Sequence, residues 1–325
     1  MKPPGRPAKA RIWLSWTLAL AILAGLLTRT PPSQLVEVTR LARLDRLLLL
    51  MAAACGLWLV IESSSLWTIL GPLHRDATDA RLSWRTVLAV RARSYLLTPI
   101  HWNLGRAGFV YELERARGVP MLASSSALLL QQSVDVWLFA GCAGLGLASL
   151  PASTQTLALA RSIAAIFLAL TLIFALLCLP LRTPMAAWPP IERIRQSRLA
   201  AAFRRTRPLE LLRVVLLRSV HCLVFVAVYT WGTAAFGLEL PLAIVLAGVP
   251  LIQTVGALPI TPAGLGTQQA MMLFLFSPYG SESSILAFGL AFGLLQTFLR
   301  FAIGLASLLF VWDPDRPRAL ERSRS

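Results

Sequence analysis

Six long runs of apolar residues, separated by polar and Arg-rich segments, dominate the pattern of this chain. They cover residues 12–27, 47–70, 131–150, 162–181, 211–236 and 284–311. An α-helix that crosses a hydrocarbon core of about 30 Å needs roughly 20 predominantly apolar residues. The pattern therefore predicts an all-α polytopic membrane protein with about six full spans.

Two further apolar regions, 87–125 and 241–277, contain breaks that a straight crossing helix would not have. Proline and glycine stand within 98–105 in the first region and within 258–269 in the second. Non-helical backbone is tolerated at membrane depth only where it is buried in protein or lines a wet cavity. We therefore predict two re-entrant helical hairpins, the first of them closed by residues 121–130. For the first region, an amphipathic surface loop is the alternative.

The two breaks share the form T-P-x-L-G with variable spacing, at 98–105 and 261–266, and each lies between two of the predicted full spans. The two halves would have opposite orientations, which predicts an inverted repeat of half-repeats 47–150 and 211–311, as found in many transporters. The helix after Gly266 would present its N-terminus, where free N–H groups favour an anion such as phosphate.

Composition agrees with a single integral membrane domain over residues 1–325. The chain is 56% hydrophobic and 14% charged, and its net charge of +16 comes almost wholly from arginine, because Lys2 and Lys9 are the only lysines. Basic residues between spans mark the cytoplasmic side and contact anionic lipid headgroups. They are scattered among loops and do not form one basic face, so we do not expect nucleic-acid binding.

The basic segments set the expected topology. We predict that 182–210 is a cytoplasmic linker lying on the anionic leaflet, with a solvated connector as the alternative, and that the basic tail 312–325 is also cytoplasmic. No small-residue cleavage motif follows 12–27, which favours an uncleaved anchor over a signal peptide. Both termini would then face the cytoplasm from the cytoplasmic (inner) membrane.

A few polar side chains fall inside the apolar runs. Gln131 and Asp135 are four residues apart, as are Gln296 and Arg300, so each pair lies on one helix face. If the two halves meet, Asp135 and Arg300 would pair across the interface. Alternatively, Arg300 snorkels toward cytoplasmic phosphates and Asp135 lies at the cytoplasmic end of its helix. Glu62 is either a functional carboxylate or a packed residue near the interface.

Enzymatic chemistry has little support in the sequence. The four cysteines show no CxxC spacing and the three histidines are dispersed, so no metal motif is formed. No P-loop and no nucleophile and base at a familiar spacing are present. We therefore expect no metal, no cofactor and no enzyme activity.

Three stretches carry a resemblance to a known family. LPITPAGLGTQQA at 258–270 resembles the L-P-I-S-P-G-G-L-G-x-R-E-A signature of the transmembrane region of lysylphosphatidylglycerol synthases and their stand-alone, flippase-like relatives. Residues 98–113 and 128–137 are similar to its L-P-x-x-x-G-E-x-x-R and E-R-x-x-D elements. Where the family commonly has Arg-Glu and Glu-Arg, this chain has Gln268-Gln269 and Gln131-Gln132. Amides keep hydrogen-bonding capacity and lose charge.

The resemblance implies lipid handling. Our leading hypothesis is translocation of a lipid, or of a lipid-linked or isoprenoid molecule, across the cytoplasmic membrane, with an anionic headgroup bound at the re-entrant helix ends. Membrane lipids and a lipid-biosynthesis enzyme are the expected partners. The alternatives are an accessory or scaffold subunit of a lipid-modifying enzyme, and a membrane-embedded headgroup transferase with Glu62 or Asp135 as base. With 14 residues after Val311, we expect no soluble aminoacyl-transfer domain on this chain.

The residues expected to bind the substrate lie at the two breaks and on the polar helix faces. They are Thr98, Asn103, Gly105, Arg106, Gln131, Gln132, Asp135, Thr261, Pro262, Gly264, Gly266, Thr267, Gln268, Gln269, Gln296 and Arg300.

Overall fold

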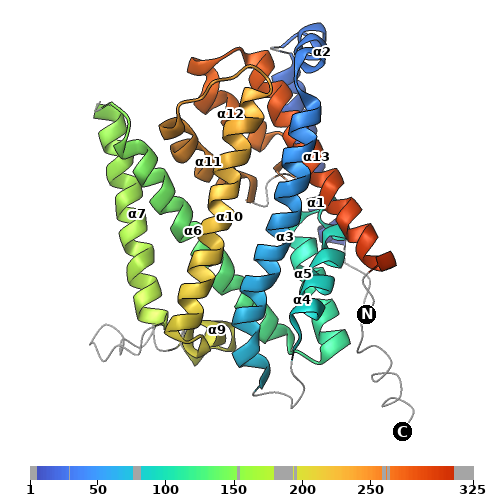
Figure 1. Ribbon diagram of the computed structural model, residues 1–325, viewed down its shortest axis with the longest axis vertical. Helices are drawn as coiled ribbons and strands as arrows, with labels where there is room; N and C mark the ends of the chain where they lie inside the picture. The colour runs from blue at the N-terminus through green and yellow to red at the C-terminus, as the bar shows by residue number, and fades with distance from the viewer. Residues whose placement is uncertain are drawn as a thin grey trace.

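The structure, a computed structural model, describes residues 6–28, 30–75, 82–151, 154–178, 193, 196–257, 261 and 264–310. Throughout these residues the regular structure is helical (Figure 1). The helices are α1 (Arg6–Leu27), α2 (Pro32–Leu41), α3 (Leu44–Arg75), α4 (Trp84–Ser94), η1 (Tyr95–Leu97), α5 (Trp102–Arg117), α6 (Met121–Ala148), α7 (Thr154–Cys178), η2 (Arg198–Ala200), α9 (Ala201–Arg205), α10 (Pro208–Ala234), α11 (Leu242–Ala257), α12 (Thr267–Phe276), η4 (Ser277–Tyr279) and α13 (Glu282–Phe310). Pro262, the tail 312–325 and residues 182–192, 194 and 195 of the linker lie outside the described residues.

Four of these helices are long and apolar enough to cross a membrane. They are the Leu44–Leu73 part of α3, all of α6, all of α10 and the Glu282–Leu309 part of α13. Each of these helices covers all or most of one predicted span, and the four spans covered are 47–70, 131–150, 211–236 and 284–311. The chain is therefore a helical membrane protein, as its apolar pattern predicts.

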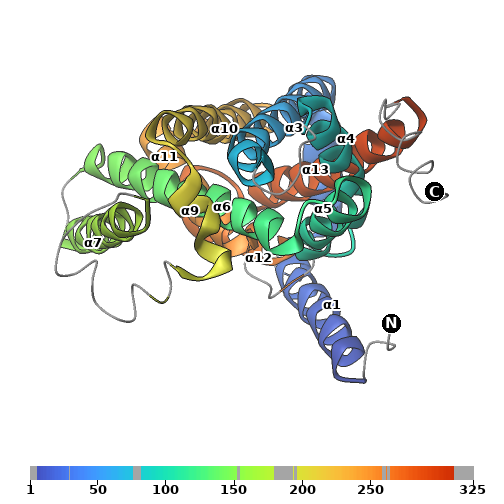
Figure 2. The same cartoon turned by 90° about the horizontal axis from the view of Figure 1, so that it is seen from below.

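The other two predicted spans, 12–27 and 162–181, also form helices, α1 and α7. Their described apolar parts, Trp16–Leu27 and Ala160–Leu176, are shorter than those of the four helices above and shorter than the roughly 20 residues of a typical crossing helix. In the described residues the structure thus supports four spans by length and composition, and the predicted total of six is not confirmed. Helix α7 lies at the edge of the bundle beside α6, and α1 projects from it near α12 (Figures 1 and 2).

The first predicted break is a helix–turn–helix. Helix α4 tightens into η1, the chain turns at 98–100, and α5 begins after His101, whose ring Nδ1 accepts a hydrogen bond from the Asn103 amide. One part of this prediction is wrong. Residues 121–130 do not close the hairpin, because they form the first turns of the continuous helix α6. Pro120 precedes them and fits a helix N-terminus, so the helix starts there and not at Gln131.

The second predicted break lies between α11 and α12. Gly264 and Gly266 have φ angles of 73° and 83°, a left-handed region that costs a residue with a Cβ about 1–2 kcal/mol. Gly266 also lies against Ala19 and Ile22 of α1, so a side chain at this position has no room. The two glycines therefore allow the chain to reverse before α12. Whether either helix–break–helix segment is re-entrant stays a prediction.

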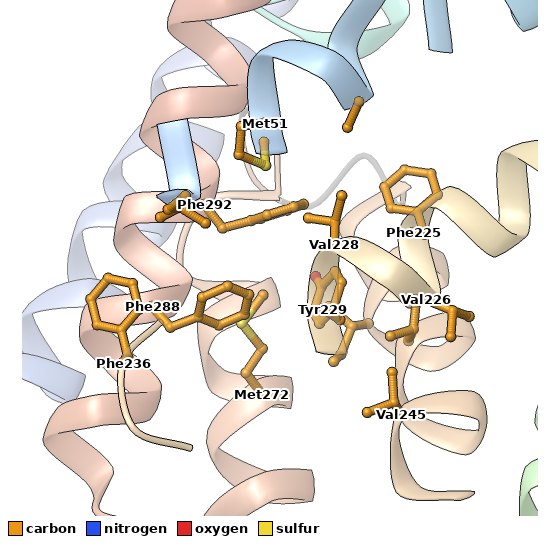
Figure 3. Packing of buried hydrophobic residues seen from close by; sticks show 14 of the residues in the cluster. Met51, Phe225, Val226, Val228, Tyr229, Phe236, Val245, Met272, Phe288 and Phe292 are labelled. Carbon is orange, nitrogen blue, oxygen red and sulfur yellow. The ribbon is translucent and has the colours of Figure 1, made fainter. Parts of the chain in front are cut away.

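Two hydrophobic clusters hold the bundle together. The larger one joins α3, α10, α11, α12 and α13 and includes Met51, Tyr229, Met272, Phe288 and Phe292 (Figure 3). Here the Tyr229 ring lies 5.1 Å from that of Phe292 and 5.6 Å from that of Phe288. The smaller cluster joins α3, α4, α5, α6, α9 and α10.

The outer surface of the bundle is apolar. Leu145, Leu168, Phe274, Leu294 and Phe298 are each at least 66% exposed. Such a broad apolar exterior would aggregate in water, and it matches the hydrocarbon of a bilayer. Close helix packing inside the bundle depends on small residues. At Gly146 of α6 an added Cβ would collide with the backbone of Ala243, Leu246 and Ala247 in α11.

Candidate functional site

A layer of buried polar residues separates the two hydrophobic clusters. Along α3, the larger cluster ends at Trp58 and the smaller one begins at Leu66, with Glu62 between them. Along α10, Val214 belongs to the smaller cluster and Phe225 to the larger one, with Arg218 and His221 in the interval. The bundle is therefore apolar at both ends and charged in its middle.

This polar layer surrounds a cavity of about 310 Å³, which is the size of a pocket for a small molecule or a headgroup. Side chains from eight helices form its wall. They are Glu62, Arg91, Trp102, Arg106, Leu128, Gln131, Gln132, Asp135, Val136, Phe139, Arg218, His221, Phe225, Gln253, Thr254, Gly256, Gln268, Gln296 and Arg300. Both predicted half-repeats thus contribute to one site.

The charged residues of the cavity lie deep along the crossing helices. Glu62, Asp135, Arg218 and Arg300 each stand at least 10 residues from either end of their helix, or about 15 Å along the axis. Charged side chains at this depth are expensive, and they occur where they pair or line a wet cavity. The predicted alternatives, that Arg300 snorkels or that Asp135 lies at a helix end, do not fit these positions.

Glu62 is the centre of the first charge cluster and is 4% exposed. Its Oε2 accepts hydrogen bonds from Arg91 Nε at 2.8 Å and from the Tyr95 hydroxyl at 2.9 Å, and lies 2.7 Å from Arg91 Nη2. Its Oε1 lies 3.6 Å from His221 Nε2 and 3.8 Å from Arg300 Nη2. Arg91 is therefore the principal counter-ion of Glu62, and Arg300 is more distant.

Asp135 forms the second charge cluster, and its partner differs from the predicted one. Both of its carboxylate oxygens accept from Arg218, with Nε to Oδ1 at 2.5 Å and Nη2 to Oδ2 at 2.6 Å. The hypothesis that Asp135 pairs with Arg300 is therefore wrong. A planar guanidinium matches a carboxylate best in this two-point arrangement, and α10 brings Arg218 to the face of α6 that carries Asp135.

Among the described residues, neither Arg300 nor Arg106 has a carboxylate within hydrogen-bond distance, and the contact of Arg300 with Glu62 is 3.8 Å long. Arg300 is enclosed by aromatic rings, with its guanidinium carbon 4.5 Å from the ring centroid of Trp102, 5.1 Å from that of Tyr95 and 5.6 Å from that of Trp58. The faces of such rings attract cations. Its Nε and Nη1 are buried and have no hydrogen-bond partner among the described residues. Arg106 donates to the amide oxygen of Gln132 and lies 6.0 Å from the Trp102 ring.

Comparison with protein families matches residues 12–304 to the lysylphosphatidylglycerol synthase TM region. The chain belongs to this family. The match covers most of the sequence, including every element of the cavity, and it makes the chain a membrane protein of lipid metabolism or translocation. Searches among curated proteins and among solved structures found no match.

The amides that replace the charges common in the lysylphosphatidylglycerol synthase family have specific contacts in this chain. Gln131 donates to the Ser65 hydroxyl and to the backbone oxygen of Glu62, so it fixes α6 against α3. Gln132 accepts from Arg106. Gln268 lines the cavity beside Gly256, where no larger residue would fit. Gln131 and Gln132 thus make hydrogen bonds without contributing charge.

The N-terminus of α12 is partly occupied by the chain itself. Gln269 Oε1 accepts from the Gly266 amide at 2.7 Å, while Gln269 Nε2 donates to the Gly289 backbone oxygen at 3.0 Å. The Thr267 hydroxyl donates to the Gly264 oxygen and lies 3.1 Å from the Thr261 hydroxyl. These contacts tie α12 to α13 and close the turn, so one of the amides expected to face an anion already has a partner.

The cavity collects part of the predicted site. Arg106, Gln131, Gln132, Asp135, Gln268, Gln296 and Arg300 line it, while Thr98 and Gly105 line a smaller adjoining void with Arg106 and Arg300. Asn103 is exposed. The residues Thr261, Gly264, Gly266, Thr267 and Gln269 form or brace the second break and are absent from the cavity wall.

Sequence reasoning missed Arg91, Arg218 and His221 as members of the site. Arg218 and His221 could have been found from the sequence, because they are three residues apart inside an otherwise apolar run and hence share a helix face. Arg91 lies in a mixed segment with several other arginines, and nothing local distinguishes it from them. In the described residues, no group of three or more His, Cys, Asp or Glu is placed to hold a metal ion.

Proposed function

We propose that this protein translocates a lipid with an anionic headgroup across the cytoplasmic membrane and that the headgroup binds in the cavity between the two halves. The observation that carries the proposal is a charge imbalance at mid-depth. Four arginines and two carboxylates face the cavity, which leaves two positive charges in excess. Uncompensated charge is costly in a low-dielectric interior, so an anion entering the site relieves that cost.

The position of the cavity supports translocation rather than storage at one membrane face. The charged groups lie near the middle of the crossing helices, as the substrate sites of many transporters do. A headgroup at this depth has left the interface of either leaflet. The apolar residues Leu128, Val136, Phe139 and Phe225 line the same cavity, and they offer a surface for the glycerol backbone or the start of an acyl chain.

The carboxylates are poorly suited to act as bases in a headgroup transferase. Glu62 already accepts from Arg91 and Tyr95, and Asp135 is held at two points by Arg218. The carboxylate oxygens that already accept these hydrogen bonds are poorly placed to take a proton from a substrate. Glu62 and Asp135 are therefore better described as structural counter-ions of a binding site than as catalytic bases.

A reconstituted flip assay tests the proposal. The purified protein is placed in vesicles with a fluorescent anionic phospholipid, and accessibility of the label to a membrane-impermeant quencher is followed with time. We expect protein-dependent translocation, reduced at least about tenfold in Arg106→Gln, because one charge-assisted hydrogen bond contributes about 1.5–3 kcal/mol. Arg106 has no carboxylate partner among the described residues, so this variant leaves no buried acid unpaired.

Arg115→Gln is the matched control, since Arg115 lies on the same helix and is exposed. It should translocate at the wild-type rate. Equal rates for Arg106→Gln and wild type, or no translocation by a folded wild-type protein with any anionic phospholipid, would overturn the proposal.

A further inference from the structure

The two arginines that lack a close carboxylate are neighbours. Arg300 and Arg106 flank the same indole, at 4.5 and 6.0 Å from the Trp102 ring centroid, so their guanidinium carbons are no more than about 10.5 Å apart. Both also line a void of about 10 Å³ that adjoins the cavity and is bordered by Thr98 and Gly105. The excess positive charge is therefore concentrated on one side of the cavity.

The other two arginines are already compensated. Arg91 contacts Glu62 at 2.7 Å, and Arg218 contacts Asp135 at 2.5 and 2.6 Å. Glu62 is the nearest carboxylate to Arg300, at 3.8 Å, and it is shared with Arg91. Pairing each carboxylate with its closest arginine leaves two positive charges, both at the Trp102 side.

We propose that the preferred ligand of this cavity is a lipid phosphomonoester, whose dianionic phosphate binds between Arg106 and Arg300. This inference rests on the proposed function and specifies its substrate class. A phosphomonoester carries a charge of about −1.5 to −2 at pH 7 and has three terminal oxygens. A phosphodiester headgroup carries a single negative charge, so it leaves one of the two arginines uncompensated in the buried site.

Binding of matched lipids to the purified protein tests this preference. Dioleoyl phosphatidic acid and dioleoyl phosphatidylglycerol share their acyl chains and differ in being a phosphomonoester and a phosphodiester. Affinities are measured in nanodiscs at pH 7.5 by titrating each lipid and following intrinsic tryptophan fluorescence or native mass. We expect phosphatidic acid to bind at least about tenfold more tightly, since it adds one charge-assisted hydrogen-bonded pair.

Gln132→Glu provides a sharper test than loss of an arginine. Gln132 already accepts from Arg106, and glutamate has nearly the same shape, so the substitution supplies Arg106 with a carboxylate and lowers the excess charge from two to one. The preference for phosphatidic acid should fall at least about fivefold. Gln34→Glu is the control, because Gln34 is exposed on α2, and it should keep the wild-type preference.

The binding of soluble glycerol 3-phosphate and of inorganic phosphate is measured in the same way, to distinguish a lipid ligand from a soluble one. The first is a phosphomonoester and the second is free phosphate, and neither has acyl chains. Weak binding of both, at least about tenfold below phosphatidic acid, supports a lipid ligand, and equal or tighter binding overturns it. Equal affinities for phosphatidic acid and phosphatidylglycerol, or an unchanged ratio in Gln132→Glu, overturn the phosphomonoester preference. These outcomes are independent of the flip assay, in which lack of translocation overturns the proposed function even when the binding preference is found.

Discussion

Replacing Glu62 by glutamine should destabilise the protein strongly, although the two side chains have nearly the same shape. Glutamine can keep its one acceptor oxygen at the Oε2 position, where Arg91 and Tyr95 donate, but its NH2 group then replaces Oε1 and faces His221 Nε2 and Arg300 Nη2. It also removes the charge that compensates Arg91 at 2.7 Å and that lies 3.8 Å from Arg300. Removing one partner of a buried ion pair typically costs about 3–5 kcal/mol, because the other charge stays buried without compensation.

The chain offers a closely matched control for this prediction. Arg93 Nη1 and Glu112 Oε1 are also 2.7 Å apart, but their side chains are 14% and 29% exposed, against 8% and 5% for Arg91 and Glu62. Partly exposed pairs contribute about 0–1 kcal/mol. Glu112→Gln should therefore destabilise the protein by less than about 1 kcal/mol, even though the substitution and the distance are the same.

The free energy of unfolding is measured in mixed detergent micelles without added lipid, in a background in which the half-buried Cys142 and Cys178 are replaced by alanine. A thiol-reactive dye then reports exposure of the buried Cys55 and Cys222. Adding Arg91→Met to Glu62→Gln removes the uncompensated cation and should recover at least about 1 kcal/mol of the loss. If Glu62→Gln and Glu112→Gln destabilise the protein equally, or if the double variant is no more stable than Glu62→Gln, burial does not determine the strength of this ion pair and our reasoning is wrong.

Two further predictions concern packing and ligand charge. Gly146→Ala should destabilise the protein by about 1–3 kcal/mol, because its Cβ would lie 2.7 Å from the Ala243 oxygen and collide with the α11 backbone. Gly144→Ala is the control and should be tolerated, because the atom nearest to its Cβ is 3.9 Å away. Equal thermal stability of the two variants would contradict the close contact at Gly146. The preference for phosphatidic acid over phosphatidylglycerol should fall about fourfold between pH 7.5 and pH 5.5 in the nanodisc titration, because the second pKa of a phosphomonoester is about 6. His221 also faces the site, and a positive charge there would attract a dianion more than a monoanion and raise the ratio, so a fall in the ratio reports the phosphate. A ratio that does not fall in His221→Gln would contradict a dianionic ligand. The other titratable or charged groups facing the phosphate are Glu62, Arg91, Tyr95, Asp135 and Arg218.

The sequence was informative about elements and much less so about partners. Run length and apolarity are local properties, so the four long spans and the two interrupted regions were predictable. The start of α6 was not, because residues 121–130 are shorter and more polar than a full span, and only their continuity with 131–150 makes them helical turns of a crossing segment. The number of crossings depends on α1 and α7, whose apolar parts within the described residues are Trp16–Leu27 and Ala160–Leu176.

The pairing of buried charges depends on which helix faces meet, and one sequence does not contain that information. Arg300 was the predicted partner of Asp135, and its actual partner Arg218 follows from the contact of α10 with α6. Glu62 was recognised as unusual from its apolar surroundings. Its partners come from α4, η1, α10 and α13, which are up to 238 residues away along the chain.

The exchange of family charges for amides does not by itself explain the excess charge of the cavity. Each replaced pair combines one acidic and one basic residue, so replacing both by glutamine leaves the net charge unchanged. At one of these positions, Gln132, the amide gives Arg106 a neutral oxygen as its partner. With no carboxylate at 131, 132, 268 or 269, Arg106 and Arg300 remain available on one side of the cavity. The amides therefore preserve the shape and hydrogen bonding of the site while leaving its positive charge for a ligand to neutralise.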